Sequence, residues 1–180
     1  MSEDDDQRRI ERCFREHSPA IARYFLRRCA TAGDAEEATT DVFAIAWRRI
    51  DRLPPEPETR LWLFGVARNV LADHQRAARR RARLGDRLTA AQPSAAAAPD
   101  PIAATVEALA VRDAWRSLSD GDRELLALLA WDGLAVAEIA RVLRLPAPVV
   151  SARLYRARRR LAHRLSTLEA RSSQQPCPTT

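Results

Sequence analysis

Apolar side chains recur at intervals of three and four residues along most of the chain, which is the repeat of an amphipathic helix. Glycine is scarce, with five residues, and no stretch alternates apolar and polar positions between hairpin signals, as strands do. The pattern therefore predicts an all-α fold. Residues 8–30 predict two successive helices, because Ser18 followed by Pro19 is a typical helix start.

Two longer helices are predicted in the rest of the N-terminal half, over residues 35–50 and 60–84. Asp34 can cap the first of them, with Glu37 three residues on as its partner in a capping box. Between the two helices, residues 51–59 contain three prolines. Because proline fixes its own φ and restricts the preceding residue, this segment predicts a stiff loop.

The composition changes after these helices. Residues 85–109 are rich in alanine and proline, which predicts a flexible linker between two helical domains. Helical periodicity then resumes: Ser119 caps one predicted helix, and an Asp-Gly turn follows it. Residues 136–143 predict a short helix, and a tight connection separates it from a longer helix that begins at Pro148. This spacing predicts a helix-turn-helix.

The last predicted helix separates apolar from basic positions. An apolar stripe with spacings of three and four faces its own domain, and the opposite side is basic, with no acidic residue from Arg144 to Leu165. One interpretation is a solvated surface helix, but such helices normally carry both signs of charge. We therefore favour DNA binding, since the second helix of this motif enters the major groove. The apolar stripe consists of Val150, Leu154, Ala157, Leu161, Leu165 and Leu168. The candidates for base contact are Ser151, Ala152, Arg153, Tyr155 and Arg156. The candidates for phosphate contact are Arg158, Arg159 and Arg160.

Charge and hydropathy exclude several classes of protein. The chain has thirty basic residues, all of them arginine, against twenty-four acidic ones. The first six residues, MSEDDD, lack the basic start of a secretory signal, and no apolar run is long enough to cross a bilayer. We expect a soluble, cytoplasmic protein that does not insert into membranes.

Candidate chemistry outside the basic helix is sparse. Cys13 and His17 are four residues apart and Cys29 could lie near them, but a zinc site would want a fourth ligand and tighter spacing. A buried cysteine and a surface histidine are therefore favoured. The chain has three cysteines, too few for a disulfide framework, and one of them, Cys177, lies in the tail. The sequence contains no phosphate-binding glycine loop, nucleophile elbow or metalloprotease motif. We expect no metal, no cofactor and no enzymatic activity.

Two stretches resemble one protein family. The segments DAEEATTDVFAIAW and RLWLFGVARNVLADHQR resemble the second conserved region of extracytoplasmic-function (ECF) sigma factors. The segment LSDGDRELLALLAWDGLAVAEIARVLRLPAPVVSARLYRARRRL resembles their fourth conserved region. The resemblance implies a sigma factor that directs promoter recognition, DNA melting and transcription initiation by core RNA polymerase. It implies a region 2-like domain at 1–84, a linker at 85–109, a region 4-like domain at 110–168 and a disordered tail at 169–180.

The resemblance also implies which residues meet each partner. The clamp helices of the polymerase beta-prime subunit would contact Asp34, Glu36, Glu37, Asp41, Phe43 and Trp47, although packing in the core is an equally good role for the two aromatic residues. The promoter −10 element would contact Arg60, Trp62, Asn69, Asp73, Arg76, Arg79 and Arg80. The −35 element would contact Ser151, Ala152, Arg153, Tyr155, Arg156, Arg158 and Arg159. An anti-sigma factor is a possible further partner.

The chain departs from the family pattern at a few positions. Many relatives have Leu and Gln where this chain has Ala38 and Thr40, and an aromatic residue where it has Thr59. Ser151 and Ala152 replace a frequent Lys-Ser pair, so the preferred −35 sequence is open. Two alternatives also stay open: a stand-alone helix-turn-helix regulator that binds duplex DNA without polymerase, and a helical adaptor that binds only protein.

Overall fold

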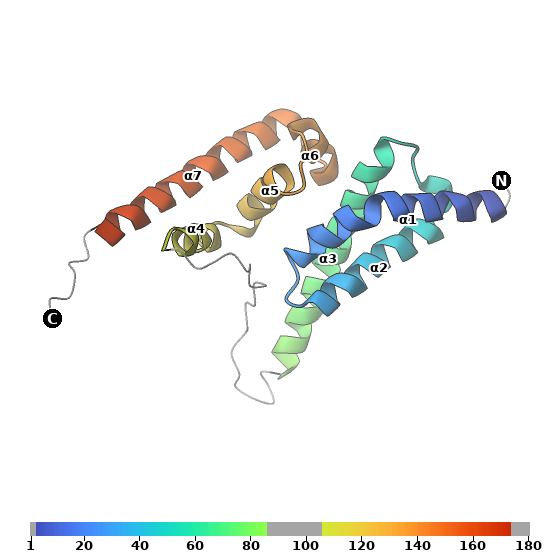
Figure 1. Ribbon diagram of the computed structural model, residues 1–180, viewed down its shortest axis with the longest axis horizontal. Helices are drawn as coiled ribbons and strands as arrows, with labels where there is room; N and C mark the ends of the chain where they lie inside the picture. The colour runs from blue at the N-terminus through green and yellow to red at the C-terminus, as the bar shows by residue number, and fades with distance from the viewer. Residues whose placement is uncertain (1–2, 86–105, 174–180) are drawn as a thin grey trace. The chain divides into compact units, whose positions relative to one another are not determined.

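The computed structural model describes residues 3–85 and 106–173. Within these residues every regular element is a helix, which confirms the predicted all-α class (Figure 1). The chain divides into two compact units, one with helices α1–α3 and the other with helices α4–α7. Of the predicted linker, residues 86–105 lie outside the described ones, as do residues 174–180 of the predicted tail. The bounds of both were wrong, because residues 106–109 belong to a helix and residues 169–173 continue the last helix instead of being disordered. None of the described helices has the length and hydropathy needed to span a bilayer.

Helix α1 is one continuous helix, Glu3–Leu26, and the predicted break at Ser18 and Pro19 is wrong. Proline inside a helix removes one backbone hydrogen bond and crowds the preceding turn. The helix continues because its buried face extends on both sides of the proline. Cys13 is buried before it and Ile21 after it. Burial of an apolar face, rather than local preference, supplies most of a helix's stability in a folded protein.

Helix α2, Ala32–Arg48, begins earlier than predicted. Its N-cap is Thr31, whose Oγ1 accepts a hydrogen bond from the backbone N–H of Asp34 at 3.0 Å. The same hydroxyl donates to the Asp34 carboxylate at 2.8 Å. Asp34 is therefore the third helical residue rather than the cap, and its carboxylate bonds the side chain of the cap residue.

The proline-rich segment is irregular as predicted, although it is shorter. A short 3-10 helix, η1, occupies Ile50–Arg52, and helix α3 begins directly after the last proline and covers Glu58–Gly85. The Arg9 guanidinium on α1 donates to the backbone carbonyls of Ile50 and Leu53. The start of the segment is thereby fastened to α1.

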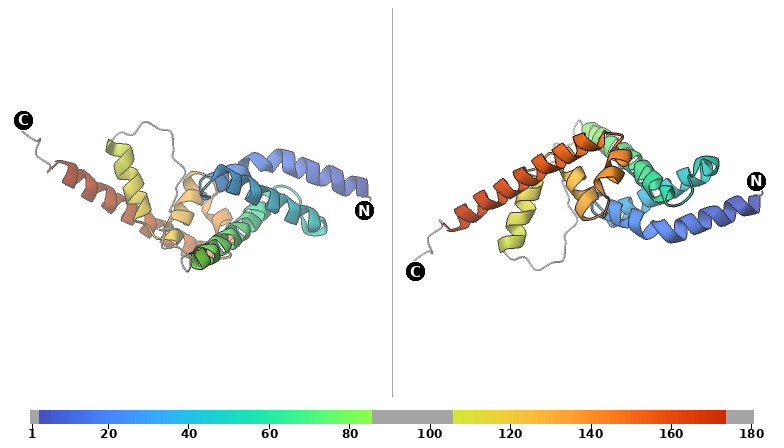
Figure 2. Two further views of the ribbon diagram at one scale, coloured as in Figure 1. Left: turned by 90° about the horizontal axis from the view of Figure 1, so that it is seen from below. Right: turned by 90° about the horizontal axis from the view of Figure 1, so that it is seen from above.

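Helices α1, α2 and α3 pack against one another, and α1 and α2 lie side by side in the views of Figures 1 and 2. Their core is centred on Tyr24, whose ring meets those of Phe25 and Phe64 edge to face at 5.3 and 5.8 Å between centroids. All three side chains are at most 1% exposed. This core fixes which faces of α2 and α3 remain outside.

The second unit starts with helices α4, Val106–Arg116, and α5, Asp120–Ala130. Ser119 caps α5 as predicted, since its hydroxyl accepts from the backbone N–H of Asp122 at 3.2 Å. The predicted turn follows, with Gly133 at φ 66°, a conformation that glycine adopts without steric cost.

Helices α6, Val136–Leu143, and α7, Ala147–Ser173, form the predicted helix-turn-helix. Arg144 ends α6 in the left-handed conformation with φ 54°, and the backbone N–H of Leu145 donates to the Ala140 carbonyl at 2.9 Å. This geometry reverses the chain within three residues. Helix α7 packs on α4, α5 and α6, so it is held along its inner side and open along its outer side.

Candidate nucleic-acid and polymerase interfaces

The inner side of α7 is the predicted apolar stripe. Val150, Leu154 and Ala157 are at most 2% exposed, and Leu161 and Leu165 are half-buried as the helix extends beyond its neighbours. The side chain of Leu168 lies outside the described ones. Because this stripe is fixed against α4–α6, the basic side chains between its members have to face outward.

Four arginines on α7 project from this outer face: Arg153, Arg156, Arg158 and Arg159. Within the described residues, none of the four forms an ion pair with an acidic side chain. Arg156 Nε donates to the backbone carbonyl of Ala152 at 3.2 Å, and Arg159 lies over the Tyr155 ring at 5.9 Å. These contacts orient the side chains without neutralising their charge, so the face is available to phosphates and bases.

Arg160 behaves differently from the expectation that it contacts phosphate. Its Nη1 lies 2.6 Å from Oδ2 of Asp122, whose side chain is only 10% exposed. Asp122 is in the first turn of α5, so this ion pair fastens α7 to α5. This ion pair favours a structural role for Arg160 over the predicted phosphate contact, whereas the four neighbouring arginines form no ion pair among the described residues.

The first turns of α7 carry small and apolar exposed side chains. Ser151 and Ala152 are exposed, and Tyr155 is 62% exposed. Val149 is also 37% exposed, although our sequence analysis did not select it. Its exposure could have been expected from its position, because it follows Pro148 at the N-terminal end of the helix, the end that meets base edges in this motif. A methyl-bearing side chain at such a position can contact the C5-methyl group of thymine.

Helix α3 presents one outward stripe, because its opposite face is buried in the first unit. Trp62 is half-buried, while Asn69, Asp73, Arg76 and Arg80 are exposed at helical spacings of seven, four, three and four. Arg79 is exposed beside them, and Arg60 is half-buried over the Phe64 ring at 5.5 Å. The structure therefore brings most of the predicted −10 residues onto one face.

Two of these residues neutralise each other. Asp73 and Arg76 form an ion pair one turn apart on α3. Both side chains are more than half exposed, so solvent screens the pair and its contribution to stability is small. Arg76 carries less free positive charge than its position alone suggests, whereas Arg79 and Arg80 form no ion pair within the described part of the chain.

The predicted polymerase-contacting residues on α2 divide into an outer and an inner group. Glu36, Glu37 and Trp47 are exposed, Trp47 to 48%. Phe43 is only 7% exposed, and its ring meets that of Phe14 at 4.8 Å. Packing is therefore the main role of Phe43, while Trp47 is free to contact a partner.

Asp34 and Asp41 both have internal partners. The Asp34 carboxylate accepts from Thr31 in the N-terminal cap of α2. The Asp41 carboxylate lies 2.8 Å from Nε2 of His74 on α3, with half of its side chain exposed. The role of Asp34 in the first turn of α2 agrees in kind with the predicted cap, whereas spacing along the sequence did not reveal the contact of Asp41 with α3.

Of the residues that depart from the family pattern, two are internal and three, Thr40, Ser151 and Ala152, are exposed. Ala38 is fully buried, so it belongs to the packing of α2 rather than to its outer face. Thr40 is exposed and its hydroxyl donates to the Glu36 carbonyl at 3.0 Å. Thr59 is 4% exposed and donates to the Pro54 carbonyl at 2.6 Å, which holds the proline segment against the first turn of α3.

The two cysteines of the described region are free thiols. Cys13 is buried as expected, and burial raises its pKa to about 11, with a further contribution from the carboxylates of Glu56 and Glu16. Burial likewise raises the pKa of the Cys29 thiol to about 11. His17 is not the surface histidine that we expected, because its side chain is only 12% exposed. Cys177 lies outside the described residues.

The two helical units together indicate a class of protein. A helix-turn-helix with an unpaired cationic outer face, joined to a second helical unit that also displays arginines, is typical of a two-domain DNA-binding protein.

Comparison with known proteins identifies the family. The family model described as Sigma-70 region 2 matches residues 13–81, and that described as Sigma-70, region 4 matches residues 108–161. The chain is 31% identical to the ECF RNA polymerase sigma factor SigL of Mycobacterium tuberculosis over 154 residues, which cover 85% of this chain and 86% of SigL. It is also 31% identical to the RNA polymerase sigma factor CnrH of Cupriavidus metallidurans, over 87% of this chain and 86% of CnrH.

Solved structures agree with this result. CnrH in complex with the cytosolic domain of CnrY is similar with a TM-score of 0.63 and 26% identity, over 89% of this chain and 90% of that one. The sigma factor RpoE of Bartonella quintana, in complex with the anti-sigma factor NepR, has the same fold, with a TM-score of 0.68 at 20% identity over 87% of this chain and 96% of that one. The chain belongs to the ECF family of RNA polymerase sigma factors. It binds core RNA polymerase and promoter DNA and directs the initiation of transcription.

Proposed function

We propose that three separate outer faces carry this function. The N-terminal half of α7 meets the duplex −35 element, the outward stripe of α3 meets the melted −10 strand, and the outer face of α2 meets the clamp helices of the polymerase. The observation that carries the proposal is the row of four α7 arginines without acidic partners in the described residues. Guanidinium groups left unpaired on an open face are suited to phosphate oxygens and guanine edges.

The roles within α7 follow from position. Arg153 and Arg156 lie near the N-terminus of the second helix of the motif, where side chains reach base edges. Arg158 and Arg159 lie a turn further on and contact phosphates, which position the protein without reading sequence. Ser151 and Ala152 line the same turns and set the −35 preference together with these arginines.

The roles within the first unit follow from exposure. Capture of a melted strand requires cations and faces on which bases stack. Arg79 and Arg80 supply free cations on α3, Trp62 supplies an aromatic edge, and Asn69 supplies an amide that pairs with a base or the backbone. On α2, Glu36, Glu37 and Trp47 form the contact with the clamp, since acidic and aromatic side chains fit a basic, partly apolar partner surface.

The same proposal covers organisation and regulation. The region 2-like domain, 1–84, and the region 4-like domain, 110–168, each bind weakly, and the linker at 85–109 raises the effective concentration of one when the other is bound. The protein acts in the cytoplasm and has no catalytic centre of its own, so phosphodiester chemistry belongs to the polymerase. CnrH was solved in complex with the cytosolic domain of CnrY, and RpoE in complex with the anti-sigma factor NepR. These complexes support an anti-sigma factor as a regulator of this chain.

The test uses purified core polymerase and a library of random promoters, with sequencing of the transcript starts. We expect the wild-type chain to select a promoter with two elements. Arg153→Ala and Arg156→Ala should each abolish most transcription from it while polymerase binding in a pull-down is retained. Arg112→Ala is the matched control, because Arg112 is an exposed arginine of α4 outside the proposed face. Normal transcription by both α7 variants would overturn the assignment of this face.

A further inference from the structure

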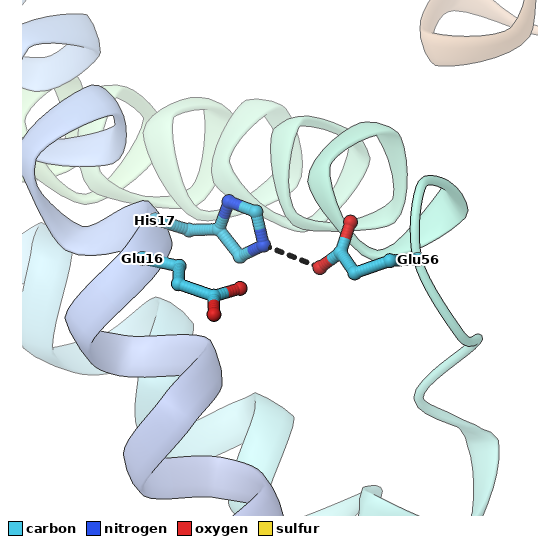
Figure 3. A group of neighbouring side chains, drawn as sticks. All are labelled: Glu16, His17 and Glu56. Atoms are coloured by element: carbon cyan, nitrogen blue, oxygen red, sulfur yellow. Dashed lines mark hydrogen bonds and ion pairs between the residues drawn. The ribbon is translucent and has the colours of Figure 1, made fainter.

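Three potential metal-ligating side chains meet where α1 faces the proline segment. Glu16 and His17 come from α1, and Glu56 comes from the segment between η1 and α3 (Figure 3). His17 Nε2 lies 2.6 Å from Glu56 Oε1. One donor atom of each of the three residues lies within 4.8 Å of the other two.

The position of Glu16 distinguishes this group from an ordinary ion pair between a histidine and a glutamate. Consecutive residues of a helix diverge by about 100°, so neighbours do not normally reach the same point. Figure 3 nevertheless shows the Glu16 carboxylate on the same side of α1 as the His17 ring and directed toward Glu56. Within the described residues, Glu16 forms no hydrogen bond or ion pair of its own. Two carboxylates thus converge on one imidazole, and no arginine pairs with either of them in the described region.

The surroundings are suited to an ion that enters from solvent. The His17 side chain is 12% exposed and therefore held by its neighbours, while the Glu56 side chain is 50% exposed. One side of the group is therefore enclosed by protein and the other is open to solvent. Imidazole nitrogen and carboxylate oxygen are donors that zinc accepts at about 2.0–2.2 Å, and three protein ligands leave one tetrahedral position for water.

We propose that Glu16, His17 and Glu56 form a binding site for a divalent cation of the zinc class. The cation replaces the hydrogen bond between His17 and Glu56, and the Glu16 carboxylate closes in as the third ligand. Bound there, it cross-links α1 to the proline segment that precedes α3. This inference is independent of the proposed function, since none of its three residues belongs to the outer faces of α7, α3 or α2.

The chain supplies its own controls, because it has three histidines. His74 also meets a carboxylate, that of Asp41 at 2.8 Å, but it belongs to no three-donor group in the described residues. His163 is exposed on α7. Replacement of either histidine therefore tests whether any imidazole suffices or whether the third ligand matters.

The experiment titrates Zn²⁺ into the tag-free full chain after removal of metals with EDTA, using isothermal calorimetry and thermal unfolding. We expect one ion per chain and a rise of the unfolding temperature with zinc. His17→Gln and Glu56→Gln should each raise the Kd at least about tenfold, by analogy with the losses seen for residues that support metal ligands. His74→Gln and His163→Gln should leave the Kd unchanged.

Glu56→Gln keeps the volume of the side chain and a hydrogen-bonding group for His17, so it separates loss of the ligand from loss of folding. Circular dichroism in EDTA checks that all four variants fold as the wild type does. The absence of stoichiometric zinc binding by the wild-type chain would overturn the proposal. So would an unchanged Kd in His17→Gln, or a loss of binding in His74→Gln or His163→Gln that equals the loss in His17→Gln.

Discussion

Arg160→Ala should destabilise the second unit without weakening its contact with DNA phosphates. The substitution leaves the Asp122 carboxylate, 10% exposed, without the guanidinium that lies 2.6 Å from it. Removal of one partner of a fully buried ion pair costs about 3–5 kcal/mol, whereas exposed pairs contribute about 0–1 kcal/mol. This pair is intermediate, because the Arg160 side chain is 52% exposed and water screens that end of it.

The position of Asp122 lowers the cost further. The carboxylate lies in the first turn of α5, where the helix dipole favours a negative charge by about 0.3–1 kcal/mol. We therefore expect the free energy of unfolding to fall by about 1–2 kcal/mol. For a domain of this size, each kcal/mol corresponds to about 4–8 °C in the unfolding temperature.

The assay is urea and thermal unfolding of the full chain, followed by circular dichroism and tryptophan fluorescence. Arg164→Ala is the matched control, since Arg164 is exposed on the same helix and forms no ion pair in the described residues. A second arm compares Arg160→Ala in the wild type with the same change in Asp122→Asn. In the Asp122→Asn chain, Arg160→Ala should lower the free energy of unfolding by less than about 0.5 kcal/mol, because residue 122 no longer carries a negative charge.

DNA binding gives an independent readout. Loss of a phosphate contact lowers the salt dependence of binding by about one unit of slope. We expect this change for Arg159→Ala and no change for Arg160→Ala on a −35 duplex. The reasoning is refuted if Arg160→Ala is as stable as Arg164→Ala, or if it lowers the salt slope as Arg159→Ala does.

Three further predictions concern residues of the first unit. Trp47→Ala should weaken the pull-down of core polymerase while the unfolding temperature stays near that of the wild type. Phe43→Ala, by contrast, should lower the free energy of unfolding by about 3–5 kcal/mol, because Phe43 is buried. Equal stability of the two variants would contradict the assignment of Phe43 to the core and of Trp47 to the outer face of α2. In a Cys177→Ser chain, alkylation of Cys13 and Cys29 at pH 8 should be about 100-fold slower in the native state than in urea. The reason is that a thiol of pKa about 11 holds about 100-fold less thiolate than one of pKa 9. The fold favours the protonated thiols, so their contribution to stability is complete below pH 9 and is lost as the pH rises toward 11; a native rate equal to that in urea would show that the thiols are accessible. Pro19→Ala should raise the free energy of unfolding by about 1–3 kcal/mol, since it restores a backbone donor inside α1; a fall in stability would show that the proline ring packs favourably.

Local features were predictable where a short stretch of sequence decides the outcome. The α6 helix has the predicted bounds, and the Ser119 cap is present as predicted, because a cap requires only the residue and the backbone three positions on. The cap of α2 was misassigned by three residues, since both Thr31 and Asp34 have capping side chains and lie one turn apart. The ion pair of Asp73 with Arg76 could also have been predicted from its spacing of three.

The amino-acid sequence by itself determined that the chain is all-helical, where its helix-turn-helix lies and which side of α7 is basic, because these follow from periodicities of three and four residues. Tertiary structure alone decided that α1 continues through Pro19 and that Phe43 is buried while Trp47 is exposed. It also decided that Arg160 pairs with Asp122, whereas the neighbouring arginines have no acidic partner in the described part of the chain. It also brought Glu56 to His17, residues 39 positions apart. Such contacts join residues that are distant in the sequence. Their energies depend on which surfaces are removed from water when the helices pack, and a local sequence pattern does not specify those surfaces.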